Sequence, residues 1–369
     1  MRIVYVLNSL AVGGTERQVA GLAQRMAARG HAVALVVLRP QERDGFATNL
    51  DVVHLDINNA ASLMAGLRRG VAFLRGFRPD LIHSHNFHGN MLGRAFKLND
   101  RRAALVSTIH NVYEGGWPRM LAYRLSDGLA DRVTAVSEAV AERYVRMKAV
   151  SRSKCVVVTN GIETGEFTPD AERRRATREE MGVGEEFVWL MVGRNTVAKD
   201  HANLMQAFGR AWRQLKQSQL WIAGGAPDGN QKTYAAISMP HGALDHVRRL
   251  GARRDIPALL DAADGFVLSS AWEGMPLAVG EAMAMERPVV ATDVGGVREL
   301  VGDAGAIVPA KDSNALAEAM VATMRRPAAA RAEMGRAARE RICSRFSMDR
   351  KAEEWEALYR SVLGGGIRM

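Results

Sequence analysis

Two glutamates eight residues apart, Glu273 and Glu281, flank a sequence that suits the binding of an anion. Gly274 and Pro276 between them predict a tight turn after a short apolar strand, and a helix is expected to begin near Leu277. The first backbone N–H groups of such a helix have no partner within it, so they form a ready site for a diphosphate. The spacing would separate the two carboxylates along one ligand; the alternative is two unrelated surface glutamates.

Two cations follow another apolar strand, which is expected at residues 187–192. Arg194 and Lys199 could converge on a pyrophosphate, the arginine as a planar fork and the lysine as a point charge. The alternative is a loop with two solvated cations. Gly13 and Gly14 lie between the first strand and the first helix, but the full G-x-G-x-x-G fingerprint is absent, so alone they predict only a tight turn.

Several histidines also follow strand ends. His110 comes just after a strand, where open α/β sheets place groups that bind ligands. His83, His85 and His88 follow another strand, and their spacing superficially suggests a metal site. No carboxylate completes that set and nothing else in the sequence supports it, so a metal is disfavoured. His31, at the end of the first helix, is interpreted as structural.

The elements that must position these residues alternate between short β-branched runs and helix-length amphipathic segments. This alternation is typical of a mostly parallel sheet wound with helices on both sides. The sequence predicts strands at residues 3–7, 32–38, 81–84, 104–108, 132–135 and 156–159, and then at 187–192, 220–223, 265–268, 288–291 and 306–308. Because the pattern restarts, we expect two Rossmann-like domains in tandem.

The predicted domains are residues 1–165 and 166–348, since a turn at Asn160-Gly161 and a linker around Pro169 separate the two patterns. The segment 349–369 begins as an amphipathic helix and is expected to pack back on the first domain. The chain of 369 residues, 47% apolar and 24% charged, suits two globular domains and excludes global disorder. No apolar run approaches the roughly 18 residues of a membrane helix, and the first residues resemble a strand rather than a signal peptide, so a soluble cytoplasmic protein is expected.

Positive charge is concentrated in the first half of the chain. Residues 1–165 hold 22 Lys and Arg against 13 Asp and Glu, which accounts for nine of the ten net charges. A solvated basic face is the simpler interpretation. The functional one is attraction to an anionic acceptor or to the inner face of a membrane, through the amphipathic segments 60–77 and 90–102. Nucleic acid is disfavoured because aromatic residues are few and are not interleaved with the arginines.

Taken together, these segments resemble glycosyltransferase family 4, whose members are retaining enzymes of the GT-B fold. Residues 10–16 are similar to the family's N-terminal Gly-Gly-x-Glu loop, and 108–111 to its acceptor-side histidine segment. Residues 160–167 are similar to the segment that closes the first domain, and 193–199 to the phosphate-binding pair. Residues 222–227 and 250–255 are similar to the base-contacting strand and loop. Residues 273–281 are similar to the E-x7-E motif, and 288–299 to the segment that follows it. One departure is Pro240, where the family usually has an unbroken helix, because proline ends or kinks a helix.

The resemblance implies an α/β GT-B fold, with two Rossmann-like doubly wound domains facing a central cleft. It implies four catalytic side chains, namely His110, Arg194, Lys199 and Glu273. It also implies a set of residues that bind the donor, namely Gly13, Gly14, Arg194, Lys199, Ala252, Arg253, Glu273, Gly274, Met275, Pro276, Leu277 and Glu281. No metal or other cofactor is expected, since the nucleotide-sugar is a substrate.

The resemblance also implies a role for each of these residues, and the chemistry of the side chains allows it. The two cations would neutralise the diphosphate leaving group, helped by the backbone around Pro276. Glu281 would accept from the ribose hydroxyls, Glu273 and His110 would contact the transferred sugar, and the main chain at 252–253 would contact the base. The expected reaction is retaining transfer from a UDP-sugar, or a GDP-sugar, to a hydroxyl of a saccharide or lipid-linked acceptor in polysaccharide, lipopolysaccharide or glycolipid synthesis. The alternatives are a sugar-nucleotide epimerase of the same architecture, a transferase for a soluble small-molecule acceptor, and an inactive nucleotide-binding scaffold.

Overall fold

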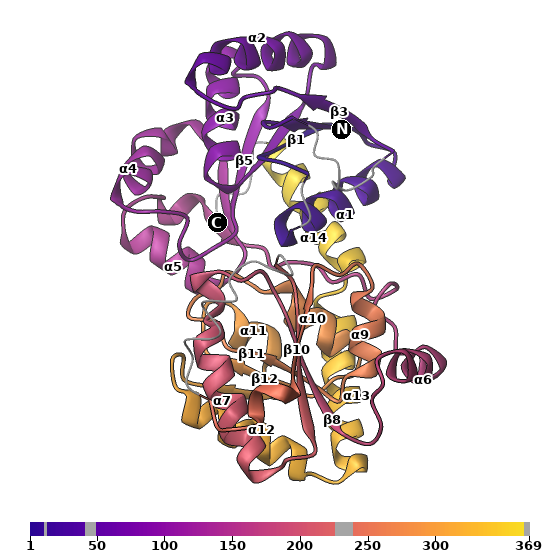
Figure 1. The fold of residues 1–369 in the computed structure, drawn as a ribbon. Helices are drawn as coiled ribbons and strands as arrows, with labels where there is room; N and C mark the ends of the chain where they lie inside the picture. Colours follow the sequence, from indigo (N-terminus) through magenta and orange to yellow (C-terminus); the bar gives the residue numbers. More distant parts are fainter. Residues whose placement is uncertain (11–12, 41–48, 226–238, 365–369) are drawn as a thin grey trace. The chain divides into compact units, whose positions relative to one another are not determined.

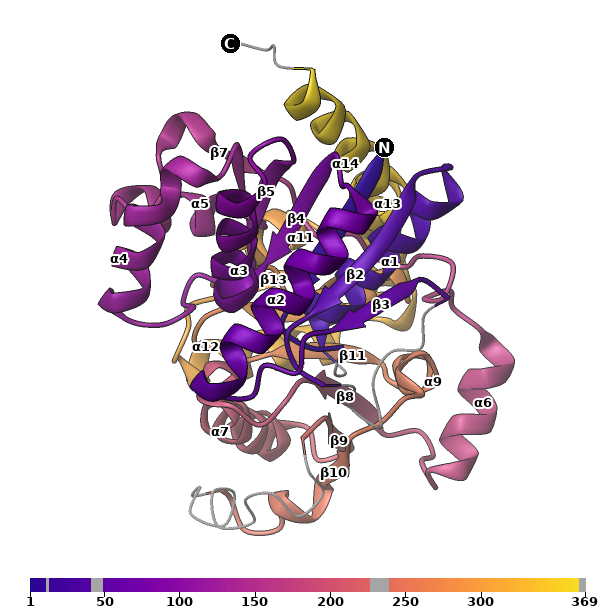
Figure 2. The same cartoon turned by 90° about the horizontal axis from the view of Figure 1, so that it is seen from above.

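A computed structural model describes the chain except residues 11–12, 41–48, 226–238 and 365–369, and the chain divides into two compact units (Figure 1 and Figure 2). The first unit is Met1–Gly161 together with Met348–Met369, and the second is Ile162–Ser347. The sequence interpretation places the first boundary at 165/166 and the return at 348/349, slightly later in the chain at both points. The predicted Gly-Gly loop and the segment after Gly225 lie partly outside the described residues.

The first unit is built on a parallel sheet of seven strands in the order β3-β2-β1-β4-β5-β6-β7. In chain order the strands are Arg2–Leu7 (β1), Ala32–Val37 (β2), Asp51–His54 (β3), Leu81–His85 (β4), Ala104–Ile109 (β5), Arg132–Ala135 (β6) and Cys155–Val157 (β7). The strands β1 and β2 are nearly continuous apolar runs, as expected for parallel strands that are covered on both faces. The middle strand β4 is equally buried, but its sequence LIHSH includes polar residues. The strand β3 was not predicted, because this short edge strand is only half-buried and has little apolar pattern.

Helices and short 3-10 turns connect these strands. They are Gly14–Ala28 (α1), Ala60–Phe77 (α2), Asn86–Asn99 (α3), Trp117–Ser126 (α4), Asp127–Leu129 (η1), Glu138–Arg146 (α5) and Arg152–Lys154 (η2). The helix Met348–Leu363 (α14) belongs to this unit and packs beside α1. Its Tyr359 hydroxyl lies 3.2 Å from that of Tyr5 on β1, so the end of the chain forms part of the first unit's core.

Much of the segment 90–102, one of the two proposed for membrane contact, is buried. Leu92 and Phe96 of α3 are buried in the core. Arg94 is also buried, and it donates to Ser107 Oγ at 3.2 Å. Lys97 forms an ion pair with Asp131 at 2.9 Å. These two basic residues therefore have partners within their own domain, whereas Leu98, Arg101 and Arg102 are exposed, so membrane contact through this segment stays a prediction.

The second unit has a parallel sheet of six strands in the order β10-β9-β8-β11-β12-β13. In chain order they are Phe187–Val192 (β8), Ser218–Ala223 (β9), Val247–Gly251 (β10), Gly265–Leu268 (β11), Val289–Thr292 (β12) and Ala306–Val308 (β13). Alternate side chains, such as Trp189 and Met191 on β8, pack into one core with the helices His201–Gln214 (α7) and Ser313–Arg325 (α12). The edge strand β10 was not predicted, because its sequence VRRLG has no apolar run.

The helices and short turns of this unit, in chain order, are Ala171–Glu180 (α6), Val197–Lys199 (η3), His201–Gln214 (α7), Ala243–His246 (η4), Ile256–Ala262 (α9), Leu277–Ala284 (α10), Val297–Val301 (α11), Ser313–Arg325 (α12) and Ala328–Arg345 (α13). Pro240 precedes η4 and lies outside any helix, and its ring packs against Gly209 of α7. The strand order changes direction at β8, since β9 lies on one side of it and β11 on the other. Such a switch point is where open α/β sheets bind ligands.

Candidate functional site

The switch point of the second unit brings together Lys199 and Glu273. Lys199 lies at the end of η3 after β8, and Glu273 lies in the loop after β11. Their Nζ and Oε1 atoms are 2.7 Å apart, and Ser270 Oγ donates to the same oxygen at 2.6 Å. The side chains are 18% and 10% exposed, so this pair is sheltered but open to solvent. Sequence reasoning predicted both residues, but not their pairing.

Backbone contacts fix the two loops that carry this pair. The N–H of Ala271 donates to the Ala198 carbonyl at 2.7 Å, and Ser269 Oγ donates to the Lys199 carbonyl at 2.8 Å. Gly295 has a φ of +54°, and a Cβ there would lie 2.2 Å from the Glu273 carbonyl oxygen. Only glycine fits this close approach, so the loop after β12 holds the Glu273 turn in place.

Helix α10 begins at Leu277, as predicted, with Pro276 as its N-cap residue. No side chain caps this end, so the first N–H groups are available to an anion. Met275 and Pro276 are buried, which fixes where those groups lie. Glu281 lies one turn further along α10 and is also buried, at 7% exposure.

Arg194 lies in the loop after β8 and, unlike Lys199, has no partner among the described residues. Its side chain is exposed and makes no hydrogen bond or ion pair with any residue that the structure describes. Gly224 has a φ of +118°, and a Cβ there would lie 2.5 Å from the Gly193 carbonyl oxygen. The loop after β9 is thereby packed against the residue that precedes Arg194.

The predicted base-contacting residues follow the edge strand β10. Ala252 is exposed, and Arg253 is half-buried. The guanidinium of Arg253 is paired with Asp255 at 2.8 and 2.5 Å. Because its side chain is paired with Asp255, Arg253 would contact a ligand through its main chain.

The residues predicted in the first unit lie at the carboxyl ends of its own strands. Gly13 is the N-cap of α1 and Gly14 its first residue, in the turn that leads from β1. His110 follows β5, and its Nε2 lies 3.0 Å from Nδ1 of His85. Burial lowers the pKa of His110 to about 3, so its ring is neutral at pH 7. A neutral imidazole offers hydrogen bonds to a sugar hydroxyl without adding charge.

A buried polar network that sequence reasoning missed supports His110. The carboxylate of Glu114 accepts from the His110 backbone N–H at 3.1 Å and from the Tyr123 hydroxyl at 2.9 Å. Burial raises the pKa of Glu114 to about 7. Asn90 of α3 extends the network by donating to the Tyr123 oxygen at 3.0 Å. Only the proximity of Glu114 to His110 in the sequence could have indicated this role.

Comparison with known proteins shows the family of this chain. Residues 12–166 match the family model described as Glycosyltransferase Family 4, and residues 186–326 match that of Glycosyl transferases group 1. Alpha-maltose-1-phosphate synthase of Mycolicibacterium smegmatis is 34% identical over 310 residues, covering 76% of this chain and 79% of that protein. This chain belongs to glycosyltransferase family 4.

Two further comparisons are informative. The UDP-Gal:alpha-D-GlcNAc-diphosphoundecaprenol alpha-1,3-galactosyltransferase of Escherichia coli is 26% identical and covers 67% of each chain. The crystal structure of Anabaena HepE in complex with UDP superposes with a TM-score of 0.83 at 22% identity, over 98% of this chain and 100% of that one. The predicted architecture is thus confirmed as two Rossmann-like domains of the GT-B type.

Within this family 4 glycosyltransferase, the second unit brings Lys199, Glu273 and the start of α10 together, and Arg194 lies in the same loop as Lys199. His83 and His85 contact neighbouring rings and hydroxyls, with His83 2.6 Å from both Tyr359 and Thr108. His31 lies 3.1 Å from Glu356 of α14. No group of three or more His, Cys, Asp or Glu side chains that could hold a metal occurs among the described residues.

Proposed function

We propose that this family 4 glycosyltransferase transfers a sugar from a UDP-sugar to a hydroxyl of a saccharide or lipid-linked acceptor, with retention of configuration and without a metal ion. The observation that carries the proposal is the pairing of Lys199 with Glu273 beside the uncapped start of α10. This arrangement combines a cation and backbone donors for a diphosphate with a carboxylate for sugar hydroxyls.

The leaving group of such a transfer is a nucleoside diphosphate, and its negative charge grows as the glycosidic bond breaks. The ammonium of Lys199 has N–H groups beyond the one that it gives to Glu273, and Arg194 has its whole guanidinium to offer. Cations that stabilise the growing charge lower the barrier, which is the role that a divalent metal plays elsewhere. We propose that these residues replace the metal.

The carboxylates would orient the donor. Ser270 and Lys199 hold one oxygen of Glu273, which leaves Oε2 to accept from a hydroxyl of the transferred sugar. Glu281 would accept from the ribose hydroxyls, and the main chain of Ala252 and Arg253 would contact the base. In the first unit, Gly13 and Gly14 would approach the phosphates and His110 would contact the transferred sugar. No side chain is assigned as a covalent nucleophile, so the acceptor hydroxyl is proposed to attack on the leaving-group face.

The donor and acceptor classes rest on relatives. HepE was crystallised with UDP, and the E. coli relative is named for UDP-galactose and a diphosphoundecaprenol acceptor. We therefore favour a UDP-sugar over a GDP-sugar, and a role in the synthesis of cell-surface polysaccharide, lipopolysaccharide or glycolipid. A soluble glycoside acceptor is the competing outcome.

A donor panel tests this proposal. The enzyme is incubated with UDP-, GDP- and ADP-sugars, and nucleotide release is followed with and without EDTA. We expect release from a UDP-sugar at the same rate in both conditions. When a saccharide acceptor is added, the NMR spectrum of the transfer product should show the donor's anomeric configuration. Activity abolished by EDTA and restored by Mg²⁺ or Mn²⁺ would overturn metal independence. An inverted product would overturn retention, and a C2-inverted sugar nucleotide would indicate the epimerase.

Peripheral attachment to an anionic membrane is the second part of the proposal, and it rests on α2. No helix of the described residues is long and apolar enough to cross a bilayer. The outer side of α2 exposes Met64, Arg68 and Arg75, whose spacing places them on one face. Each basic residue near an anionic surface contributes about 1 kcal/mol, so such a face would give weak attachment that salt reverses.

Flotation with liposomes tests the attachment. We expect binding to anionic vesicles at low salt, none to neutral vesicles, and a loss in the variant Arg68→Gln/Arg75→Gln. The matched control is Arg213→Gln/Arg336→Gln, which removes two exposed charges from the second unit. Equal, negligible binding to both kinds of vesicle would favour a soluble acceptor.

A further inference from the structure

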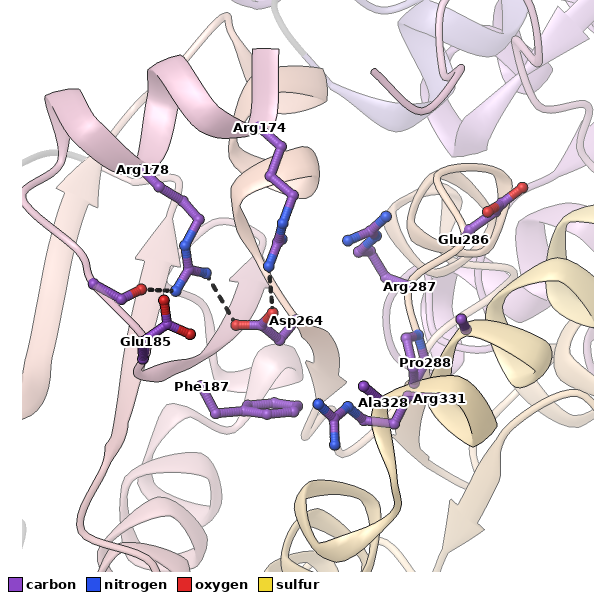
Figure 3. Close-up of a pocket in the computed structure, with 12 residues that line it drawn as sticks. Arg174, Arg178, Glu185, Phe187, Asp264, Glu286, Arg287, Pro288, Ala328 and Arg331 are labelled. Carbon is purple, nitrogen blue, oxygen red and sulfur yellow. Dashed lines mark hydrogen bonds and ion pairs between the residues drawn. The ribbon is translucent and has the colours of Figure 1, made fainter. Parts of the chain in front are cut away.

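A cavity of about 600 Å³ lies beside α6 and α13 in the second unit (Figure 3). Its lining includes Phe187 at the start of β8, Asp264 just before β11 and Pro288 just before β12. These are the amino ends of the strands, whereas Lys199 and Glu273 follow their carboxyl ends. The cavity is therefore separate from the site described above.

Four arginines line this cavity, and two of them have structural partners. Arg174 and Arg178 of α6 share the carboxylate of Asp264, at 2.6 and 3.0 Å. Arg174 also donates to the carbonyls of residues 261, 262 and 263, at the end of α9. These two side chains fasten α6 to the sheet, and one carboxylate balances both cations.

The other two arginines have no acidic partner. Arg287 donates to the carbonyls of Met285 at 2.7 Å and Ala263 at 2.9 Å. Arg331 of α13 donates to backbone carbonyls and lies over the Phe187 ring, 5.4 Å from its centre. Neither forms an ion pair with a carboxylate in the described part of the chain. A guanidinium has five N–H donors, so both retain donors for a ligand.

The charges around the cavity favour an anion. Its lining has four arginines against three carboxylates, Asp264, Glu185 and Glu286. Asp264 is already shared and Glu185 is exposed. Burial lowers the pKa of Arg287 and the nearby charge of Arg174 lowers it further, more than the charges of Asp261, Asp264 and Glu286 raise it. An anion bound to Arg287 would stabilise its charge against both effects.

We propose that this cavity binds a phosphomonoester, with its phosphate on Arg287 and Arg331. Two guanidinium groups from separate elements suit a dianion with several oxygens better than a single carboxylate. A cavity of this volume accommodates a small organic molecule rather than an ion alone. Phe187, Pro288 and Ala328 provide apolar surface for the organic part, and Figure 3 shows them beside the arginines.

Calorimetric titration with inorganic phosphate and with phenyl phosphate tests the proposal. We expect saturable binding of both, tighter for phenyl phosphate because of the apolar lining. The variant Arg287→Gln/Arg331→Gln should weaken binding about tenfold or more, since each charge-assisted hydrogen bond contributes on that scale. Arg336→Gln, which removes an exposed charge from the same helix α13, is the matched control and should bind as the parent does.

A second pair of variants leaves every existing contact intact. Ala332 is exposed on α13 and lines the cavity, so Ala332→Glu places a carboxylate at its edge, and Ala332→Gln is the neutral control of equal size. We expect weaker phosphate binding in the first variant only. Lys199→Gln should leave binding unchanged. Absence of saturable binding, or binding lost in Lys199→Gln and kept in the cavity variants, would overturn the proposal.

Discussion

Replacing Lys199 by Met should separate the two roles of this residue, because it removes the ammonium and keeps most of the stem. The stem packs closely against Gly193, where a Cβ would lie 2.9 Å from Lys199 Cε. The sheltered Glu273 carboxylate accepts hydrogen bonds from two described side chains, Lys199 and Ser270. Without the ammonium, the bond from the Ser270 hydroxyl is the one that remains. The loss of one hydrogen-bond donor to this sheltered carboxylate lowers the free energy of unfolding by about 1–3 kcal/mol. For a domain of this size we expect the melting temperature to fall by about 2–10 °C.

The catalytic effect should be larger than the effect on stability. Loss of a group that stabilises the leaving-group charge costs about two orders of magnitude or more in turnover. The assay is nucleotide release at saturating donor, combined with thermal unfolding of Lys199→Met, Glu273→Gln and the double variant. Because both side chains contact each other, their stability effects should be non-additive by about 1 kcal/mol. Arg213→Met, which removes an exposed cation, is the control and should change neither quantity.

Two results would refute this reasoning. A Lys199→Met enzyme that folds normally and keeps most of its turnover would remove Lys199 from the site. Strictly additive stability effects in the double variant would show that the 2.7 Å pair contributes no interaction energy in solution.

Three other perturbations have defined outcomes. Glu281→Gln should lower turnover by about two orders of magnitude with the chain still folded, measured by nucleotide release and circular dichroism. The pKa of Glu114 is raised to about 7, so the folded protein favours the protonated form of this side chain. The free energy of unfolding should therefore fall as pH rises from about 4.5 through 7. In chemical denaturation, Glu114→Gln should show a weaker dependence on pH. Hydrogen bonds from Arg360, Arg29 and His31 lower the pKa of Glu356 to about 2, so its contribution is present above about pH 4.5 and disappears as pH falls toward 2. Glu356→Gln should therefore be less stable by about 1 kcal/mol at pH 7, and this difference should vanish in acid.

Local sequence determined most of the strands and the start of the key helix. A short continuous apolar run such as residues 187–192 is typical of a buried parallel strand, and β8 has those bounds. Helix α10 begins at Leu277 because Pro276 and the glycine before it leave little choice of backbone conformation. The edge strands β3 and β10 were missed because an exposed edge does not require an apolar pattern.

Tertiary structure decided which residues meet. Lys199 and Glu273 pair only because β8 lies beside β11 in the sheet, an order that neither segment encodes by itself. The same holds for Arg94, which looked like part of a free basic face but is buried against Ser107 of a neighbouring strand. Residue types predict which chemistry is possible, whereas strand order and burial decide which groups share a site, because hydrogen bonds and charges act over a few ångströms whatever their separation along the chain.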